Sequence, residues 1–154
     1  MMRLGVTMIA SFLGTKASFS ADFALVATVV AAILLTIGWR LAVGRRYEAH
    51  RWVQTVAVCL NAVPVAFWMV YSFVKYVAPD LPGILDQGSY LLTSIHAVVG
   101  AIGVVVGAYI VIRANQFEAQ GRDIAPLKRA MGVSYLLYTL GVLLGIAVYL
   151  ALYR

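Results

Sequence analysis

Four long apolar segments alternate with short polar stretches along the chain. The segments cover about residues 23–43, 50–77, 89–112 and 130–153, and the few charged residues within them lie near their ends. Each segment reaches the ~20 residues that an α-helix needs to cross the core of a bilayer. The pattern therefore predicts an all-α membrane protein with four transmembrane helices in an up-down bundle, built as a single domain over residues 21–154.

The first twenty residues do not continue this pattern. They hold an early cation, a short apolar run and several small residues, which is similar to a secretory signal peptide. We favour instead a short interfacial helix over residues 1–20, with Leu4, Met8, Ile9, Phe12 and Leu13 on its apolar side. A flexible N-terminal segment is the alternative.

Composition supports the membrane assignment and narrows the function. Hydrophobic residues make up 63% of the 154-residue chain and charged residues 12%, more apolar surface than a soluble domain of this length can bury. The net charge of +6 does not indicate nucleic-acid binding, because the cations lie in short loops and form no stripe. No nucleophile with a histidine and an acid, no phosphate loop and no CxxC pair is present, so we expect neither an enzyme nor a metal site.

The distribution of charge predicts how the chain lies in the membrane. Eight of the twelve cations fall in the first and third loops and their flanks: Arg40, Arg45, Arg46, Arg51, Arg113, Arg122, Lys128 and Arg129. Cytoplasmic loops carry such an excess, so we expect both termini outside, in a bacterial plasma membrane. All six acids lie outside the apolar segments or at their edges. Expecting no carboxylate inside the membrane, we disfavour a pump or ion-coupled transporter.

Two helices carry matching faces of small residues. His96, Gly100, Gly103 and Gly107 recur at helical spacing on the third helix, and the fourth repeats that spacing with Ser134, Tyr138, Gly141 and Gly145. Small residues let helix backbones approach closely in lipid, so the two faces are predicted to pack together. His96 would then face Gly145, with the hydroxyl of Tyr149 as its hydrogen-bond partner.

A histidine inside the membrane is costly to bury and therefore a candidate for function. His96 is either a hydrogen-bonded structural residue, a group that faces a partner protein, or a ligand of a haem or chlorin lined by Gly100, Gly103 and Tyr149. The only other histidine, His50, lies near the opposite membrane surface, too far away to share one metal. A haem would need Met69 or a partner subunit as its second axial ligand.

The second helix holds two further polar candidates. Pro64 cannot donate a backbone hydrogen bond and should kink the helix, and Asn61 lies one turn before it. Asn61 is expected to bond across helices or to line a cofactor or quinone site. His50 is expected to contact lipid headgroups or Glu48, or else a docking partner. The residues proposed for partner contact are His50, Asn61, Gly141 and Gly145.

Several of these residues together resemble a known family. Glu48, His50 and Arg51 open one helix, Tyr90 and Leu92 precede His96 and its glycines, and the last helix ends in VYLALYR. Over roughly residues 23–154 this pattern resembles the CtaM/YozB family of small four-helix membrane proteins. The resemblance implies a role in maturing a haem–copper terminal oxidase, without a known catalytic reaction. Family members often carry a histidine in the basic third loop, where this chain reads APLKRAMG.

Two functions follow as expectations. The first is a non-enzymatic membrane helper in assembly or maturation of a haem–copper respiratory oxidase, whose partners are membrane protein subunits and lipid. The second, favoured by His96 and by the missing loop histidine, is a permanent accessory or haem- or chlorin-binding subunit of an electron-transfer or photosynthetic complex.

Overall fold

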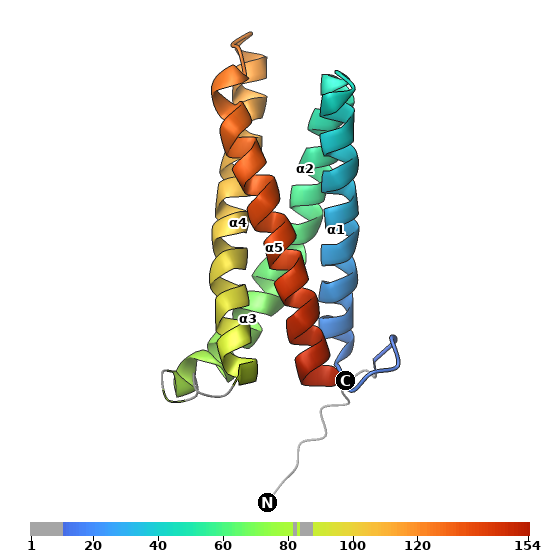
Figure 1. The fold of residues 1–154 in the computed structure, drawn as a ribbon, viewed down its shortest axis with the longest axis vertical. Coiled ribbons are helices and arrows are strands. Elements are labelled where there is room, and N and C mark those ends of the chain that lie inside the picture. The colour runs from blue at the N-terminus through green and yellow to red at the C-terminus, as the bar shows by residue number, and fades with distance from the viewer. Residues whose placement is uncertain (1–10, 82, 84–87) are drawn as a thin grey trace, which may run out of the picture.

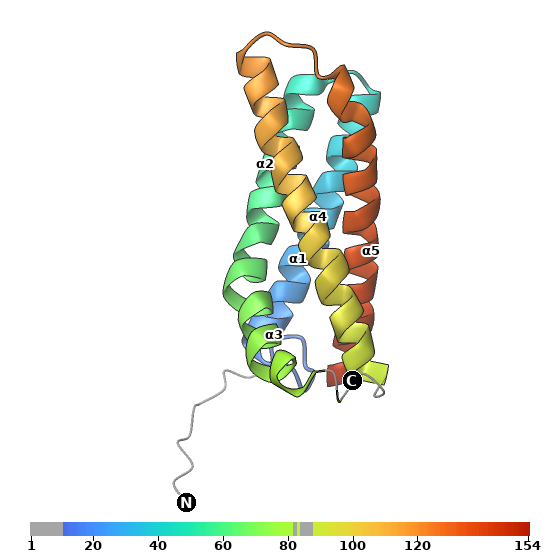
Figure 2. The ribbon, with the colours of Figure 1, turned by 90° about the vertical axis from the view of Figure 1, so that its left-hand side faces the viewer.

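The computed structural model describes residues 11–81, 83 and 88–154, and its four long helices run alternately up and down (Figures 1 and 2). They are α1 (Phe19–Val43), α2 (Tyr47–Pro64), which continues through a π-helical turn (Val65–Met69) into α3 (Val70–Tyr76), α4 (Gly88–Ala119) and α5 (Lys128–Tyr153). Short 3₁₀ turns at Ala78–Asp80 and Ala125–Leu127 complete the chain. By length and composition, four helical segments are able to cross a membrane. The predicted all-α, multi-pass bundle is confirmed.

Local capping signals set the helix ends more exactly than the apolar pattern does. Ser18 caps α1 by accepting a hydrogen bond from the backbone N–H of Ala21, so α1 begins at Phe19 instead of residue 23. Gly121 has a φ of 63° and ends α4, which lets the N–H of Arg122 bond to the carbonyl of Phe117 at 2.8 Å. Consequently α4 continues to Ala119, seven residues beyond the predicted end at residue 112.

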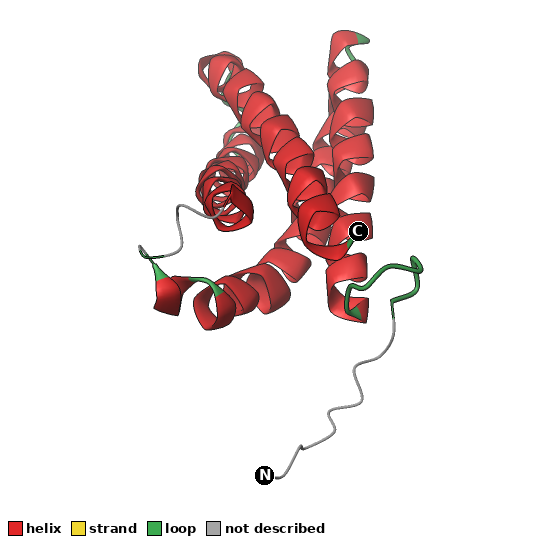
Figure 3. Cartoon of the chain, turned by 60° about the horizontal axis from the view of Figure 1, so that its bottom comes forward, coloured by secondary structure: helices red, strands yellow, loops and turns green. Residues whose placement is uncertain are grey.

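The bundle consists of two hairpins. α1 packs closely against α2, and α4 packs closely against α5, whereas contacts between the two pairs are fewer (Figures 1 and 3). In the first hairpin, polar side chains of α2 bond to backbone carbonyls of α1. His50 Nδ1 lies 2.7 Å from the carbonyl oxygen of Gly38, and Gln54 Nε2 donates to the carbonyl of Leu35 at 3.2 Å.

Glycines hold the second hairpin together, as the matching faces predict. A Cβ atom placed on Gly141 would lie 3.9 Å from the Cα of Gly100, and one on Gly103 would lie 3.8 Å from the backbone of Leu137. The two helices therefore approach so closely at these glycines that a single added methyl group would already touch the opposite backbone, and larger side chains would push the helices apart. His96 faces Gly145, because a Cβ on Gly145 would lie 3.0 Å from His96 Cε1.

Pro64 changes the helix geometry where the sequence predicts a kink. The α-helix ends at Pro64, and the next turn, Val65–Met69, is π-helical before α3 resumes the α-helical pattern. Proline removes one backbone donor and its ring crowds the preceding turn, so the hydrogen bonds shift by one residue. Figure 1 shows that the second membrane-spanning helix inclines away from α1 along its length, so that α3 lies well apart from α1.

The N-terminal segment differs from the prediction. Leu4, Met8 and Ile9 of the expected interfacial helix lie outside the described residues, and residues 11–18 form bends instead of a helix. Phe12 is 50% exposed and Leu13 45%. Gly14 has a φ of 73°, and the N–H of Lys16 bonds to the carbonyl of Tyr153 at 3.3 Å. The segment thus folds back against the end of α5, which places it at the same end of the bundle as the C-terminus.

The contact between His96 and Gly145 yields a first prediction. We expect Gly145→Leu to lower the midpoint of thermal unfolding in detergent by about 3–10 °C, because overpacking costs about 1–3 kcal/mol. Gly132→Leu is the matched control, since a Cβ there would meet nothing within 4 Å. Equal midpoints for the two variants would show that His96 does not pack on Gly145.

Candidate functional site

Three adjoining cavities lie between the two hairpins. The end cavity, about 220 Å³, is lined by Tyr149 and Tyr153 near the chain termini. The central cavity, about 310 Å³, lies over the glycines of α4 and α5. The loop cavity, about 130 Å³, adjoins Arg51 at the opposite end of the bundle. Neighbouring cavities share lining residues. The three cavities therefore form a row along the region where the two hairpins make few contacts with each other.

The central cavity is almost entirely apolar. Its floor consists of Gly100, Gly103 and Gly141, where α4 and α5 meet. Met69 of the π-helical turn and Phe73 of α3 form the opposite wall. His96 stands at its boundary with the end cavity and Tyr138 at its boundary with the loop cavity. The predicted cofactor residues His96, Gly100 and Gly103 therefore share one space, whereas Tyr149 lines only the end cavity.

Two of the polar atoms at this cavity have no partner within the chain. Among the described residues, the buried side-chain atoms without a hydrogen bond are Arg51 Nε, Ser94 Oγ, His96 Nδ1 and Tyr138 Oη. A buried polar atom left unpaired costs about 1–3 kcal/mol. His96 Nδ1 and Tyr138 Oη both belong to residues that line the central cavity.

The predicted hydrogen bond between His96 and Tyr149 does not form. The hydroxyl of Tyr149 instead donates to Asp22 Oδ1 and lies 2.7 Å from Thr15 Oγ1. The physical reason is the start of α1 at Phe19, which brings a carboxylate within reach of the end of α5. Because an ionised carboxylate is the stronger acceptor, Tyr149 points to it instead of to His96.

Asp22 lies at the edge of the first apolar segment, as the sequence predicts, and the structure adds that its carboxylate is buried within the protein. Its side chain is fully buried within the first turn of α1, and it accepts hydrogen bonds from Ser11 Oγ at 2.7 Å and from the N–H of Leu13 at 3.0 Å. The positive end of the helix dipole favours a negative charge there. The sequence signal for this site was Ser18, a good N-cap that places Asp22 inside the helix.

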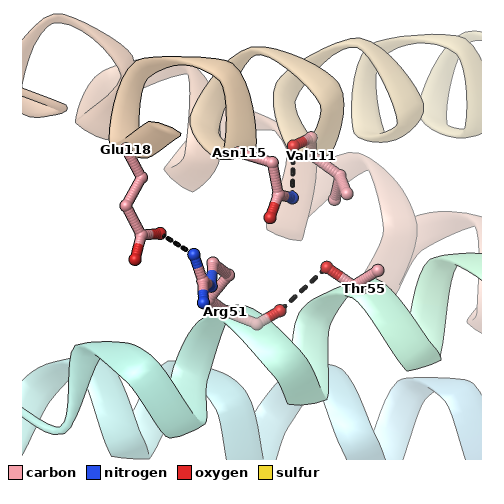
Figure 4. A network of polar contacts seen from close by, with 5 residues as sticks. All are labelled: Arg51, Thr55, Val111, Asn115 and Glu118. Carbon is pink, nitrogen blue, oxygen red and sulfur yellow. Dashed lines mark hydrogen bonds and ion pairs between the residues drawn. The ribbon is translucent and has the colours of Figure 1, made fainter. Parts of the chain in front are cut away.

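At the loop end, an ion pair joins the two hairpins. Figure 4 shows the guanidinium of Arg51 on α2 paired with Glu118 on α4. Beside it, Asn115 Nδ2 donates to the carbonyl of Val111 at 2.8 Å, and Thr55 Oγ1 donates to the carbonyl of Arg51 at 2.9 Å. The extension of α4 beyond residue 112 is what brings Glu118 to this position.

The residues proposed for partner contact occupy different places. Asn61 is 5% exposed, accepts a hydrogen bond of 3.4 Å from Thr28 Oγ1 and lines the central and loop cavities. This is the cross-helix bond that the sequence predicts for it. His50 is hydrogen-bonded to the backbone carbonyl of Gly38 on α1, and it lines only the loop cavity. Gly141 and Gly145 lie in the α4–α5 contact. Partner contact through any of these residues stays a prediction.

The geometry also bears on the haem hypothesis. Met69 lines the same two cavities as His96, from the opposite wall. Over residues 11–81, 83 and 88–154, no group of three or more His, Cys, Asp or Glu side chains is placed to hold a metal ion. A haem held by one histidine and one methionine is outside that criterion and stays a prediction.

Comparison with known proteins does not assign the chain to a family. The chain matches no family model, no curated protein and no solved structure. The resemblance to the CtaM/YozB family therefore remains a prediction from the residues that carry it.

The buried carboxylate leads to a second prediction. Asp22→Leu removes the acceptor that Ser11, Leu13 and Tyr149 share, so we expect amide hydrogen exchange across residues 11–18 to become about tenfold faster or more. Tyr149→Phe removes only one of the donors and should have a smaller effect. Asp123→Leu, at an exposed residue of the loop between α4 and α5, is the control. Unchanged exchange in Asp22→Leu would contradict the role of Asp22 in holding this segment.

Proposed function

We propose that the protein is a non-enzymatic membrane helper in assembly or maturation of a haem–copper respiratory oxidase, in the bacterial plasma membrane with both termini outside. The resemblance to the CtaM/YozB family supports the oxidase as the target. The excess of cations at the end of the bundle formed by the α1–α2 and α4–α5 connections supports the orientation. The structural observation that supports docking to another membrane protein is the outer face of α4.

The outer face of α4 carries a regular stripe of large apolar side chains. They are spaced alternately four and three residues apart, and each is at least 44% exposed: Leu91, Ile95, Val98, Ile102, Val105, Tyr109 and Ile112. This is the spacing with which one helix packs side chains into the gaps of another. Within the described chain α4 packs against α5 and, less extensively, α2, so the stripe is free for a helix of an oxidase subunit.

Deletion of the coding sequence tests the proposed role. We expect membranes of the deletion strain to lose most of their oxidase activity and the haem absorbance of that oxidase, because the subunits would not mature. A plasmid copy of the wild-type chain should restore both. Normal haem content and activity in the deletion strain would refute the proposal.

A second experiment tests the docking face. A photo-crosslinking amino acid at Val105, on the stripe and 68% exposed, should form a covalent adduct with an oxidase subunit in living cells. The same group at Ile33, which is 54% exposed on α1, should label mainly lipid. Equal adduct yields at the two positions would show that α4 is not the preferred docking face.

The second candidate is a permanent accessory or haem- or chlorin-binding subunit of an electron-transfer or photosynthetic complex. The observation that favours it is that His96 and Met69, the two residues predicted as axial ligands, line the same two cavities. The two candidates differ in stoichiometry, since a permanent subunit co-purifies with the mature complex at a fixed ratio and a helper does not.

A further inference from the structure

We propose that the loop cavity is a water-filled vestibule, which small anions enter from the end of the bundle that carries the α1–α2 and α4–α5 connections. The proposal goes beyond the assembly role and does not depend on it. It starts from a difference between two cavities. Half of the residues that line the loop cavity are polar or charged, whereas the central cavity is almost entirely apolar.

Polar side chains line the loop cavity along its length. Gln54, Thr55 and Asn61 come from α2, Asn115 comes from α4 and Ser134 from α5. Polar side chains in a membrane-spanning helix face either the bundle interior or water, because lipid offers them no hydrogen bonds. A water molecule takes about 30 Å³ in the liquid and needs two to four polar partners. The cavity, at about 130 Å³, therefore has both the room and the partners for several waters.

Two amide oxygens on these walls are placed to accept hydrogen bonds from water. The amide nitrogen of Gln54 donates to the carbonyl of Leu35, and that of Asn115 donates to a carbonyl of its own helix, which leaves each amide oxygen as an acceptor. Neither oxygen is among the buried unpaired atoms of the described residues. In Figure 4 the oxygen of Asn115 points into the space between α4 and α2. Both residues are half-buried, so water in the cavity reaches these oxygens.

The loop cavity opens at the loop end and reaches about halfway across the bundle. Arg51 and Asn61 both line it and lie ten residues apart on α2, which is about 15 Å of helix. Of the described residues that line it, only Glu118, at the end of α4, is exposed. Entry is therefore from the loop end. The central cavity, in contrast, has Val70 and Val98 in its wall, and each is more than half exposed on the outer surface of the bundle.

The charges around the entrance favour an anion. Eight cations lie in the two connections at this end and their flanks, against three acids, Glu48, Glu118 and Asp123. A cleft with low-dielectric walls and a rim of one charge concentrates ions of the opposite charge. At the entrance, the side chains of Arg51 and Glu118 are 28% and 49% exposed, so water reaches their ion pair and weakens it. A small anion can therefore pair with Arg51 in place of Glu118.

The vestibule ends inside the bundle. At Asn61 it meets the central cavity, whose largely apolar walls offer an ion few hydrogen bonds. Moving an ion into apolar surroundings is costly, so the anion does not pass farther. It enters and leaves by the same end, which makes the vestibule a binding site instead of a pore.

The test compares two neighbouring residues at the same depth on α2. Val58 lines the loop cavity, whereas the native Cys59 is exposed on the outside of the helix and does not line it. The full-length protein, in phosphatidylcholine nanodiscs, is treated with the anionic thiol reagent sulfonatoethyl methanethiosulfonate. A thiol reacts as its thiolate, which apolar surroundings disfavour. We expect Val58→Cys and, on the opposite wall, Ser134→Cys, each combined with Cys59→Ala, to react at least about tenfold faster than Cys59.

A cationic reagent of similar size, trimethylammonioethyl methanethiosulfonate, tests the preference for anions. Each rate is divided by the rate of the same reagent with 2-mercaptoethanol. We expect the sulfonate to modify Val58→Cys about three- to tenfold faster than the cation does. Glu118→Gln removes the only acid that lines the cavity among the described residues, so it should raise the sulfonate rate further. Asp123→Asn, at an exposed acid that does not line the cavity, should raise it less.

Two results would overturn the proposal. They are rates for both Val58→Cys and Ser134→Cys that do not exceed the rate for Cys59, and a normalised rate for the cation that equals or exceeds that for the sulfonate. Val58→Ala, which keeps Cys59, is the folding control: Cys59 should stay slow, because the smaller side chain does not open the bundle. Neither result bears on the deletion phenotype, so the vestibule and the assembly role can fail independently.

Discussion

The close approach of α4 and α5 at their glycines is the interaction on which the rest of the structure depends. At Gly100 and Gly141 no side chain separates the two helices, and lipid supplies no hydrophobic force to hold them together, so their association relies on close packing. The contact fixes His96 over Gly145 and makes the flat floor of the central cavity. It also turns the large side chains of α4 outward, since the small residues occupy the inner face.

The first hairpin is held differently, and the contrast explains the cavities. His50, Gln54 and Asn61 on α2 bond to groups on α1, which brings these helices together through polar contacts. Most contacts in each hairpin are therefore made between its own two helices. Contacts across the bundle are fewer, and they include the Arg51–Glu118 ion pair at one end, the Asp22–Tyr149 hydrogen bond at the other, and packing of α1 against α5 and of α2 against α4. Space remains where neither kind of contact operates, and His96 and Tyr138 are among the residues that line it.

The sequence predicts interactions that depend on periodicity and misses those that depend on position in three dimensions. Glycine spacing predicts the α4–α5 contact and the placement of His96 on Gly145, and Pro64 predicts the distortion of the second helix. The apolar pattern ends too early for α4, because polar residues beyond the lipid still form helix until Gly121. Asp22 is missed because its partners, Ser11 and Tyr149, are distant in sequence. The cavities follow from how two hairpins meet, which no local pattern encodes.

The hairpin organisation has a consequence for biosynthesis. Most tertiary contacts of α1 are made with α2, which follows it directly, and α5 in turn packs mainly on α4, which precedes it. Contacts between neighbouring segments form quickly because little loop entropy is lost. The first hairpin can therefore assemble while the second is still being synthesised. Asp22 gains its hydrogen bond from Tyr149 only after α5 has been synthesised, so this contact between the two halves forms later than the first hairpin.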